Sequence, residues 1–305
     1  MNYPESKILN IVGYAKGSGY SIFTPPESNH EWNAVEINGK WCLIDTTWAA
    51  GTTSEYYLCT PPECFVRDHL PYSNESLQFL KSPITLTKFH EIIDTDINFC
   101  KLNVDIIEDK AIQNICGKGK LMIKNKNKGI YSNIDFIPLN DGGNISYYVN
   151  RIDDGFQVYL SINNKGLFEC LVDYNGSFLA FIYFNCTEES KEKIYYPTVS
   201  DEFTSYLDAK LISPLNGHLK KGEKYNFEIK INNIDNLTIE QGDDEIIMTK
   251  NWNTFKEEDV YVHSDRIYVY TGNKRFISYI GTGDDVSYPK CSTSRAPIKV
   301  RLFQP

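Results

Sequence analysis

The stretch from residue 29 to 48, "NHEWNAVEINGKWCLIDTTW", decides the fold of the first part of the chain, because one turn separates two strand-like runs within it. Asn38-Gly39 is the dipeptide that a two-residue type I′ turn prefers, since both central residues need positive φ. A turn at this position predicts a β-hairpin with a fixed register. The predicted pairs are Ile37 with Lys40, Glu36 with Trp41, Ala34 with Leu43, Trp32 with Asp45, and His30 with Thr47.

This register assigns each side chain of the hairpin to a face. Because side chains alternate along a strand, His30 and Asp45 share one face and are diagonal neighbours, roughly 7–8 Å apart at the backbone. A hydrogen bond between their side chains can span that distance. Cys42 has the opposite parity and is predicted to be a packed thiol among apolar neighbours. The hairpin therefore offers an imidazole oriented by a carboxylate, but no nucleophile of its own.

Other interpretations of this region stay open or are disfavoured. A histidine beside an aspartate is common on strands, so context must decide whether the pair is catalytic. The glycines of "GYAKGSGY" (13–20) suggest a phosphate loop, but Gly-Lys-Ser/Thr and a following helix are lacking, and a tight backbone path is favoured. The tryptophans either line a substrate groove or pack a small core.

The context is a succession of short motifs around the hairpin. These are Gly13-Tyr14-Ala15-Lys16-Gly17, Asn29-His30-x-Trp32-Asn33-Ala34-Val35, Gly39-Lys40-Trp41, Leu43-Ile44-Asp45-x-Thr47-Trp48, Tyr57-Leu58 and Asp68-His69-x-Pro71. Together they resemble the second half of a transglutaminase-like core, and more narrowly the kyphoscoliosis-peptidase and hillarin branch of that superfamily. The resemblance covers about residues 8 to 90.

The resemblance implies a partial papain-like α+β core with catalytic residues. His30 would be the general base that takes a proton from a cysteine, and Asp45 would orient its imidazole. In the family that cysteine precedes the "GYAKG" segment by tens of residues, and none of "MNYPESKILNIV" (1–12) is a cysteine. We therefore expect an inactive, protein-binding scaffold. The alternative is a fragment of an active thiol peptidase or of a protein-glutamine crosslinking enzyme.

The remaining cysteines give no second site in the sequence. Cys59 and Cys64 with His69 could suggest a metal site, but the spacing lacks a second ligand pair, so no metal and no cofactor are predicted. Packed residues are expected instead, with Pro61-Pro62 making a turn or opening a helix. Free thiols are also expected at the other scattered positions, which are Cys100, Cys116, Cys170, Cys186 and Cys291.

Composition narrows the partners and the location. A net charge of -9 argues against nucleic acid, and no apolar run approaches the roughly 20 residues of a membrane span. Irregularly spaced cysteines without a signal-peptide core favour reduced thiols in the cytoplasm. By resemblance, the expected partners are proteins, cytoskeletal ones among them, and the expected location is cytoplasmic with cytoskeletal association.

The resemblance and the periodicity together predict three domains. The resemblance implies a partial transglutaminase-like domain at residues 1–92, and the strand pattern predicts an immunoglobulin-like β-sandwich at each of 93–192 and 193–305, with a linker near Pro197. Domains of this kind also follow the core in the resembled family. The predicted strands are 156–162, 168–174 with a turn at Asn175-Gly176, 178–186, 225–231, 266–272 and 297–303.

Overall fold

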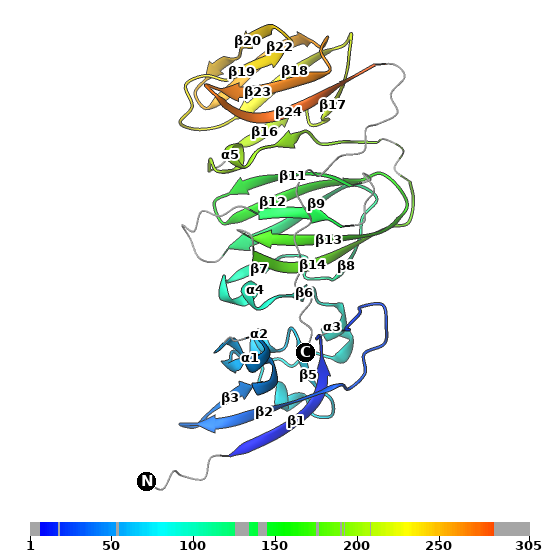
Figure 1. Ribbon diagram of the computed structural model, residues 1–305, viewed down its shortest axis with the longest axis vertical. Helices are drawn as coiled ribbons and strands as arrows, with labels where there is room; N and C mark the ends of the chain where they lie inside the picture. Colours follow the sequence, from blue (N-terminus) through cyan, green and yellow to red (C-terminus); the bar gives the residue numbers. More distant parts are fainter. Residues whose placement is uncertain are drawn as a thin grey trace. The chain divides into compact units, whose positions relative to one another are not determined.

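The computed structural model describes residues 7–17, 19–52, 55–125, 134–139, 145–174, 177–189, 191, 193–207 and 209–283 (Figure 1). It is mostly β, with 51% strand and 13% helix, which confirms the predicted β-rich architecture. Its contacts divide the chain into two compact units. Among the described residues, unit 1 lies within 7–100 and 109–112, and unit 2 lies within 101–108 and 113–283. The division into three domains stays a prediction.

Unit 1 is built on a five-stranded sheet in the order β4-β3-β2-β1-β5, with short helices around it (Figure 1). The elements of this part of the chain are β1 (Ile8–Ala15), β2 (His30–Ile37), β3 (Lys40–Ile44), α1 (Thr46–Thr52), η1 (Glu55–Tyr57), β4 (Leu58–Thr60), α2 (Pro62–Phe65), β5 (His69–Pro71), η2 (Glu75–Gln78), α3 (Leu86–Glu91), β6 (Asp94–Thr95) and α4 (Ile97–Lys101).

The β2–β3 hairpin has the predicted turn and register. Asn38 and Gly39 both have positive φ, at 52° and 76°, and Ile37 pairs with Lys40. The two outermost predicted pairs, Trp32 with Asp45 and His30 with Thr47, are wrong. The ladder stops at Ile44 because α1 begins at Thr46, and Asp45 turns its backbone N–H to the carbonyl of Tyr57 instead.

The inner face of this sheet carries a small aromatic core. Trp32 is 2% exposed and packs with Ile11, Ala34 and Leu43, while Trp48 packs against the edge of the cluster. Packing therefore accounts for these tryptophans. α2 begins at Pro62, as one of the two predicted alternatives had it.

Gly13 of β1 marks a close approach between strands in this core. It lies opposite His30 on one side and Pro71 on the other. A Cβ at this position would lie 2.2 Å from the carbonyl oxygen of Leu70 and 2.4 Å from the Trp32 ring. Only a residue without a side chain fits there, so the predicted tight backbone path is confirmed at Gly13.

The first part of unit 2 has two sheets, β10-β13-β14 with β8 beside β14, and β11-β12-β9-β7, which Figure 1 shows as adjacent layers. Buried side chains such as Val158 of β12 and Val172 of β13 come from both sheets. The alternation that predicted strands at 156–162, 168–174 and 178–186 is confirmed, whereas Asn175-Gly176 lies outside the described residues. The strands are β7 (Val104–Ile106), β8 (Ile112–Asn114), β9 (Gly117–Asn125), β10 (Ile134–Pro138), β11 (Ile145–Ile152), β12 (Gly155–Ile162), β13 (Gly166–Tyr174) and β14 (Ser177–Cys186).

The second part of unit 2 is another two-sheet sandwich, with orders β15-β24-β23-β19-β20 and β16-β18-β22-β21 and with β17 beside β24. One core joins the sheets, for example Phe227 of β18 and Phe276 of β24. The strands predicted at 225–231 and 266–272 are present, and 297–303 lies outside the described residues. Its elements are β15 (Thr198–Val199), α5 (Asp201–Thr204), β16 (Lys210–Ser213), β17 (His218–Lys220), β18 (Lys224–Lys230), β19 (Thr238–Gln241), β20 (Asp244–Ile247), β21 (Thr249–Asn251), β22 (Thr254–Tyr261), β23 (Arg266–Thr271) and β24 (Lys274–Thr282).

Within the described ranges, the helices are all too short or too polar to cross a bilayer.

The close approach at Gly13 gives a test of the unit 1 core. We expect Gly13→Ala to lower the free energy of unfolding by about 1–3 kcal/mol, because the methyl group must displace backbone or the Trp32 ring. Denaturant unfolding followed by tryptophan fluorescence measures this, since three of the four tryptophans lie in unit 1. Gly51→Ala is the matched control, because nothing lies within 4 Å of its added Cβ. Equal stability of both variants would contradict the close approach.

Candidate functional site

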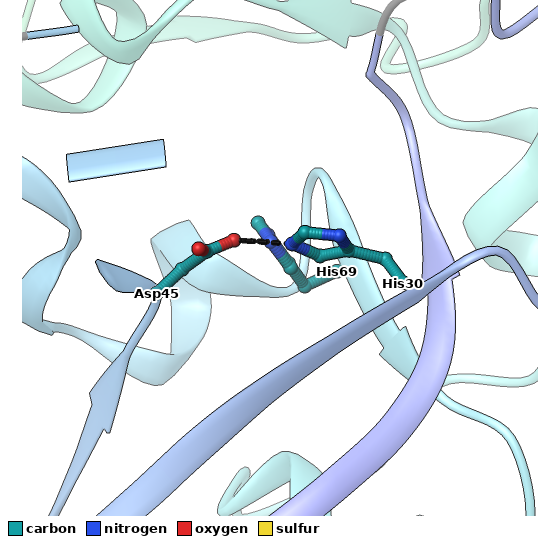
Figure 2. A group of neighbouring side chains, drawn as sticks. All are labelled: His30, Asp45 and His69. Atoms are coloured by element: carbon teal, nitrogen blue, oxygen red, sulfur yellow. Dashed lines mark hydrogen bonds and ion pairs between the residues drawn. The ribbon is translucent and has the colours of Figure 1, made fainter. Parts of the chain in front are cut away.

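The candidate site lies where β2 begins and β3 ends. His30 is the first residue of β2, and Asp45 directly follows β3. Their side chains meet on the inner face of the sheet, with His30 Nε2 2.6 Å from Asp45 Oδ2 (Figure 2). The predicted hydrogen bond between them is confirmed, whereas their catalytic roles stay a prediction.

Asp45 is 1% exposed and accepts hydrogen bonds on both carboxylate oxygens. Oδ1 accepts the backbone N–H of Trp48 at 2.9 Å, in the first turn of α1. Oδ2 accepts from His30 and, at 2.9 Å, from Nε2 of His69. Burial alone raises the pKa of a carboxyl, but the hydrogen bonds from His30, His69 and Trp48 outweigh it and hold the pKa of Asp45 well below its usual range.

His69 is a second histidine of the site, beyond the two predicted residues. It begins β5, pairs with Ala15 of β1 and is fully buried. Its Nδ1 lies 2.6 Å from Asp68 Oδ1, while its Nε2 faces Asp45 (Figure 2). Burial lowers the pKa of an imidazole, but the two carboxylates, with Asp68 the stronger, outweigh burial and raise the pKa of His69.

Aromatic rings enclose the two histidines. The ring of Phe65 stacks on His69 at a centroid distance of 4.1 Å, and the Trp48 ring lies 4.4 Å from it. Trp48 also lies 5.5 Å from the ring of His30. Aromatic faces attract cations, so the rings beside His69 partly offset the loss of water around its charged form.

His30 differs from His69 in having one ring nitrogen available. Its side chain is 17% exposed, and Nε2 is held by Asp45. Nδ1 has no hydrogen-bond partner in the described parts of the chain. A neutral His30 whose Nε2–H donates to Asp45 therefore carries a lone pair on Nδ1 that can accept a proton.

The three side chains at the site do not fit a metal ion. One nitrogen or oxygen of each of His30, Asp45 and His69 lies within 4.8 Å of the others. However, Asp45 Oδ2 lies 2.6 and 2.9 Å from the two nitrogens, as in direct hydrogen bonds. Ligands around tetrahedral zinc keep about 3.3 Å from one another at usual bond lengths. Hydrogen bonding, not metal ligation, describes this geometry.

The cysteines of unit 1 are engaged away from His30. Cys42 is half-buried on the outer face, and its thiol hydrogen-bonds that of the exposed Cys59. Partial burial and this contact raise the pKa of Cys59 to about 11. The expectation that Cys42 is well packed is wrong, because its side chain is only half-buried and the outer face of the sheet is open to solvent at Ile37.

Cys64 and Cys100 form a disulfide, with 6.0 Å between their Cα atoms. The expectation of free thiols at these two positions is therefore wrong. Nothing in their spacing of 36 residues signals the pairing, which depends on α2 and α4 packing together. Cys64 and His69 thus contact other groups than a metal ion. In the described part of the chain, Cys116, Cys170 and Cys186 form no disulfide.

Three comparisons with known proteins bear on this site. Kyphoscoliosis peptidase of Mus musculus is 39% identical over 94 residues, which is 27% of this chain and 14% of that protein. Hillarin of Drosophila melanogaster is 26% identical over 115 residues, 30% of this chain and 14% of that protein. The LIM and transglutaminase domain protein ltd-1 of Caenorhabditis elegans is 24% identical over 132 residues, 36% of this chain and 18% of that protein.

Over the matched part, these relatives support a transglutaminase-like domain protein as the class of the chain. Within that class the chain is similar to the kyphoscoliosis-peptidase and hillarin type. The chain spans only 14 to 18% of the length of these relatives. No family model matches the sequence.

Solved structures resemble the chain only weakly. Domains 5-6 of the S-layer protein SbsC match 60% of the chain and 97% of that structure, with 10% identity and a TM-score of 0.22. The tandem Ig repeats of Dlar match 59% of the chain and 96% of that structure, with 9% identity and a TM-score of 0.18. Likeness at these TM-scores carries no argument, so the sandwiches are described by their own topology.

The hydrogen bonds to Asp45 predict how stability depends on pH. A carboxyl whose pKa is lowered in the folded state stabilises it above the ordinary value of 3.8, and this contribution is lost as pH falls below that value. We expect Asp45→Asn to lower the free energy of unfolding of unit 1 by about 2 kcal/mol at pH 7. The difference in the free energy of unfolding between this variant and the native chain should narrow below about pH 4, because the native carboxyl then loses part of its stabilising contribution.

Glu36→Gln is the control for this substitution, because it makes the same chemical change in the same hairpin, at a partly exposed carboxylate that pairs with the exposed Lys7. Its effect should be within about 0.5 kcal/mol at both pH values. Denaturant unfolding with fluorescence detection compares the variants. A deficit of Asp45→Asn that is equal at pH 7 and pH 3.5 would contradict the charged hydrogen-bond network.

Proposed function

We propose that unit 1 supplies the general base and the orienting carboxylate of a cysteine-dependent acyl-transfer site, and that it is the second half of a papain-like, transglutaminase-like core. The observation that carries this proposal is the short Nε2–Oδ2 contact of His30 with Asp45, which leaves Nδ1 of a partly exposed imidazole open. The match to kyphoscoliosis peptidase and hillarin supports the same chemistry.

In this chemistry Nδ1 of His30 accepts the proton of a thiol, and the thiolate attacks the carbonyl carbon of an amide. The imidazolium then gives that proton to the departing amine, and an acyl-thioester forms. A second amine or water attacks the thioester and restores the thiol, so the proton returns through Nδ1. Asp45 holds the Nε2–H throughout and offsets the positive charge of the imidazolium.

The described chain contains the base but no thiol beside it. Cys42 and Cys59 lie at the outer face, and Cys64 and Cys100 are joined to each other. We therefore propose that the 305-residue chain by itself does not catalyse acyl transfer and acts as a protein-binding scaffold through its β-sandwiches. Cytoskeletal proteins of the cytoplasm are the proposed partners, by the family resemblance.

A second candidate function is that the chain is a piece of an active thiol peptidase or protein-glutamine crosslinking enzyme. The intact geometry of His30 and Asp45 favours this second candidate. A buried carboxylate is costly and needs several hydrogen-bond donors, and a surface that only binds proteins does not require one. The sequence of the transcript ahead of the codon for Met1 distinguishes the scaffold from the enzyme fragment. A cysteine encoded in frame at a helix start ahead of Met1 would favour the enzyme.

We expect the purified chain to incorporate no amine into a glutamine peptide and to cleave no unfolded protein, because an imidazole activates a thiol but cannot replace it. Turnover is measured beside His30→Ala and beside His90→Ala, which removes a histidine that hydrogen-bonds Tyr20 instead. Activity that survives in His90→Ala and disappears in His30→Ala would refute the absence of a nucleophile.

The scaffold proposal predicts that the inactive chain sediments with purified cytoskeletal filaments in a saturable manner. Serum albumin of similar concentration is the control for trapping. Because the net charge of the chain is -9, weak charge-driven association with acidic filaments should not occur. Recovery in the pellet no higher than that of albumin would argue against this partner class.

A further inference from the structure

The second histidine of the site has both ring nitrogens against carboxylates. Nε2 lies 2.9 Å from Asp45 Oδ2, and Nδ1 lies 2.6 Å from Asp68 Oδ1. A neutral imidazole has one N–H donor and one bare nitrogen, so one of these contacts would set a lone pair against a carboxylate oxygen. Only the imidazolium, with two N–H donors, satisfies both carboxylates.

The surroundings of His69 hold its ring in place and keep it away from solvent. Its side chain is fully buried, and the rings of Phe65 and Trp48 cover it. Asp68 is fixed in turn, since Tyr57 donates its hydroxyl to Asp68 Oδ2 at 2.8 Å. The titratable groups that face His69 are Asp45 after β3, Asp68 ahead of β5, Tyr57 of η1 and His30 of β2, whose ring centroid lies 5.5 Å from that of His69. Lys16 acts on the cluster through Asp68.

The charge of His69 acts on Asp45. Lys16, which is buried, acts on Asp68 as a second positive charge, whereas His69 is the group that stands between Asp68 and Asp45. Without the charge on His69, Asp45 would lose the attraction of that cation, and its carboxyl would bind a proton more readily. A protonated Asp45 would no longer have to accept from His30 Nε2, and the orientation of the base would be lost.

We propose that His69 is a positioning residue of the acyl-transfer site: a buried imidazolium, clamped between Asp45 and Asp68, that keeps Asp45 ionised and aimed at His30 Nε2. This inference rests on the proposed role of His30 as the general base. The test of the inference does not require catalytic turnover. The role of His69 can therefore be refuted while the proposed function holds, and the proposed function can be refuted while the role of His69 holds.

The first measurement uses the native chain labelled with ¹⁵N at histidine. Long-range ¹H–¹⁵N spectra at pH 8 distinguish an imidazolium, with two protonated nitrogens, from a neutral ring. We expect the imidazolium pattern for His69, assigned by its disappearance in His69→Gln. A neutral His69 ring at pH 8 would overturn the proposal. A native spectrum in which all five histidines are neutral at pH 8 would overturn it without any variant.

The second measurement follows the ¹³C signal of the Asp45 carboxyl with pH. In the native chain it should stay ionised to the lowest pH at which unit 1 is folded. In His69→Gln, which can still donate one hydrogen bond but has no charge, we expect Asp45 to titrate at least about one pH unit higher, a tenfold gain in proton affinity. The deshielded ¹H NMR signal of the proton between His30 Nε2 and Asp45 should lose intensity in the same variant.

Two further variants separate positioning from packing. His90→Gln makes the same change at the histidine that contacts Tyr20 and should leave the Asp45 signal unchanged. The double variant His69→Gln/Asp68→Asn removes the negative charge of Asp68 together with the positive charge of His69. The pH at which Asp45 titrates should therefore return part of the way to its native value. Folded His69→Gln with a native Asp45 titration and a native His30 proton would overturn the proposal.

Discussion

The carboxylate of Asp45 is the constraint on which the structure of unit 1 depends. It accepts from a helix backbone at Trp48, from a strand residue at His30 and from a second strand residue at His69. Two other strands and the helix that directly follows β3 thus converge on one side chain that is 1% exposed. A buried carboxylate is costly when any of its donors is missing, so the end of β3, the start of α1 and the position of β5 are fixed together.

Local patterns in the sequence were sufficient for the hairpin and for most of the β-rich part. Asn38-Gly39 fixed a two-residue turn, and alternation then placed His30 and Asp45 on one face, because both rules act over a few residues. The same alternation located β12, β13 and β14. The extrapolated pairs beyond Ile44 were wrong because helix α1 begins there, which the period of a strand does not signal.

The rest of the site depends on contacts between distant segments. His69 reaches Asp45 only because β5 pairs with β1, whose sequence is more than fifty residues away, and Asp68-His69 by itself resembles any polar pair. The outer face around Cys42 was expected to be covered, since Val35, Ile37 and Ile44 are apolar, but a sheet with one open face also carries such residues. Parity assigns a side chain to a face and does not say what covers that face.

The bond between Cys64 and Cys100 closes a covalent ring of chain that contains β5, α3 and β6, and therefore His69. Wherever that bond is formed, the unfolded chain has fewer conformations to lose, and the gain is greater for a large ring than for a small one. The ring also changes what a single backbone cut can do. A protease that nicks an exposed loop between these two cysteines leaves both new ends tethered, so the segment that carries the second histidine stays attached to the sheet it packs against.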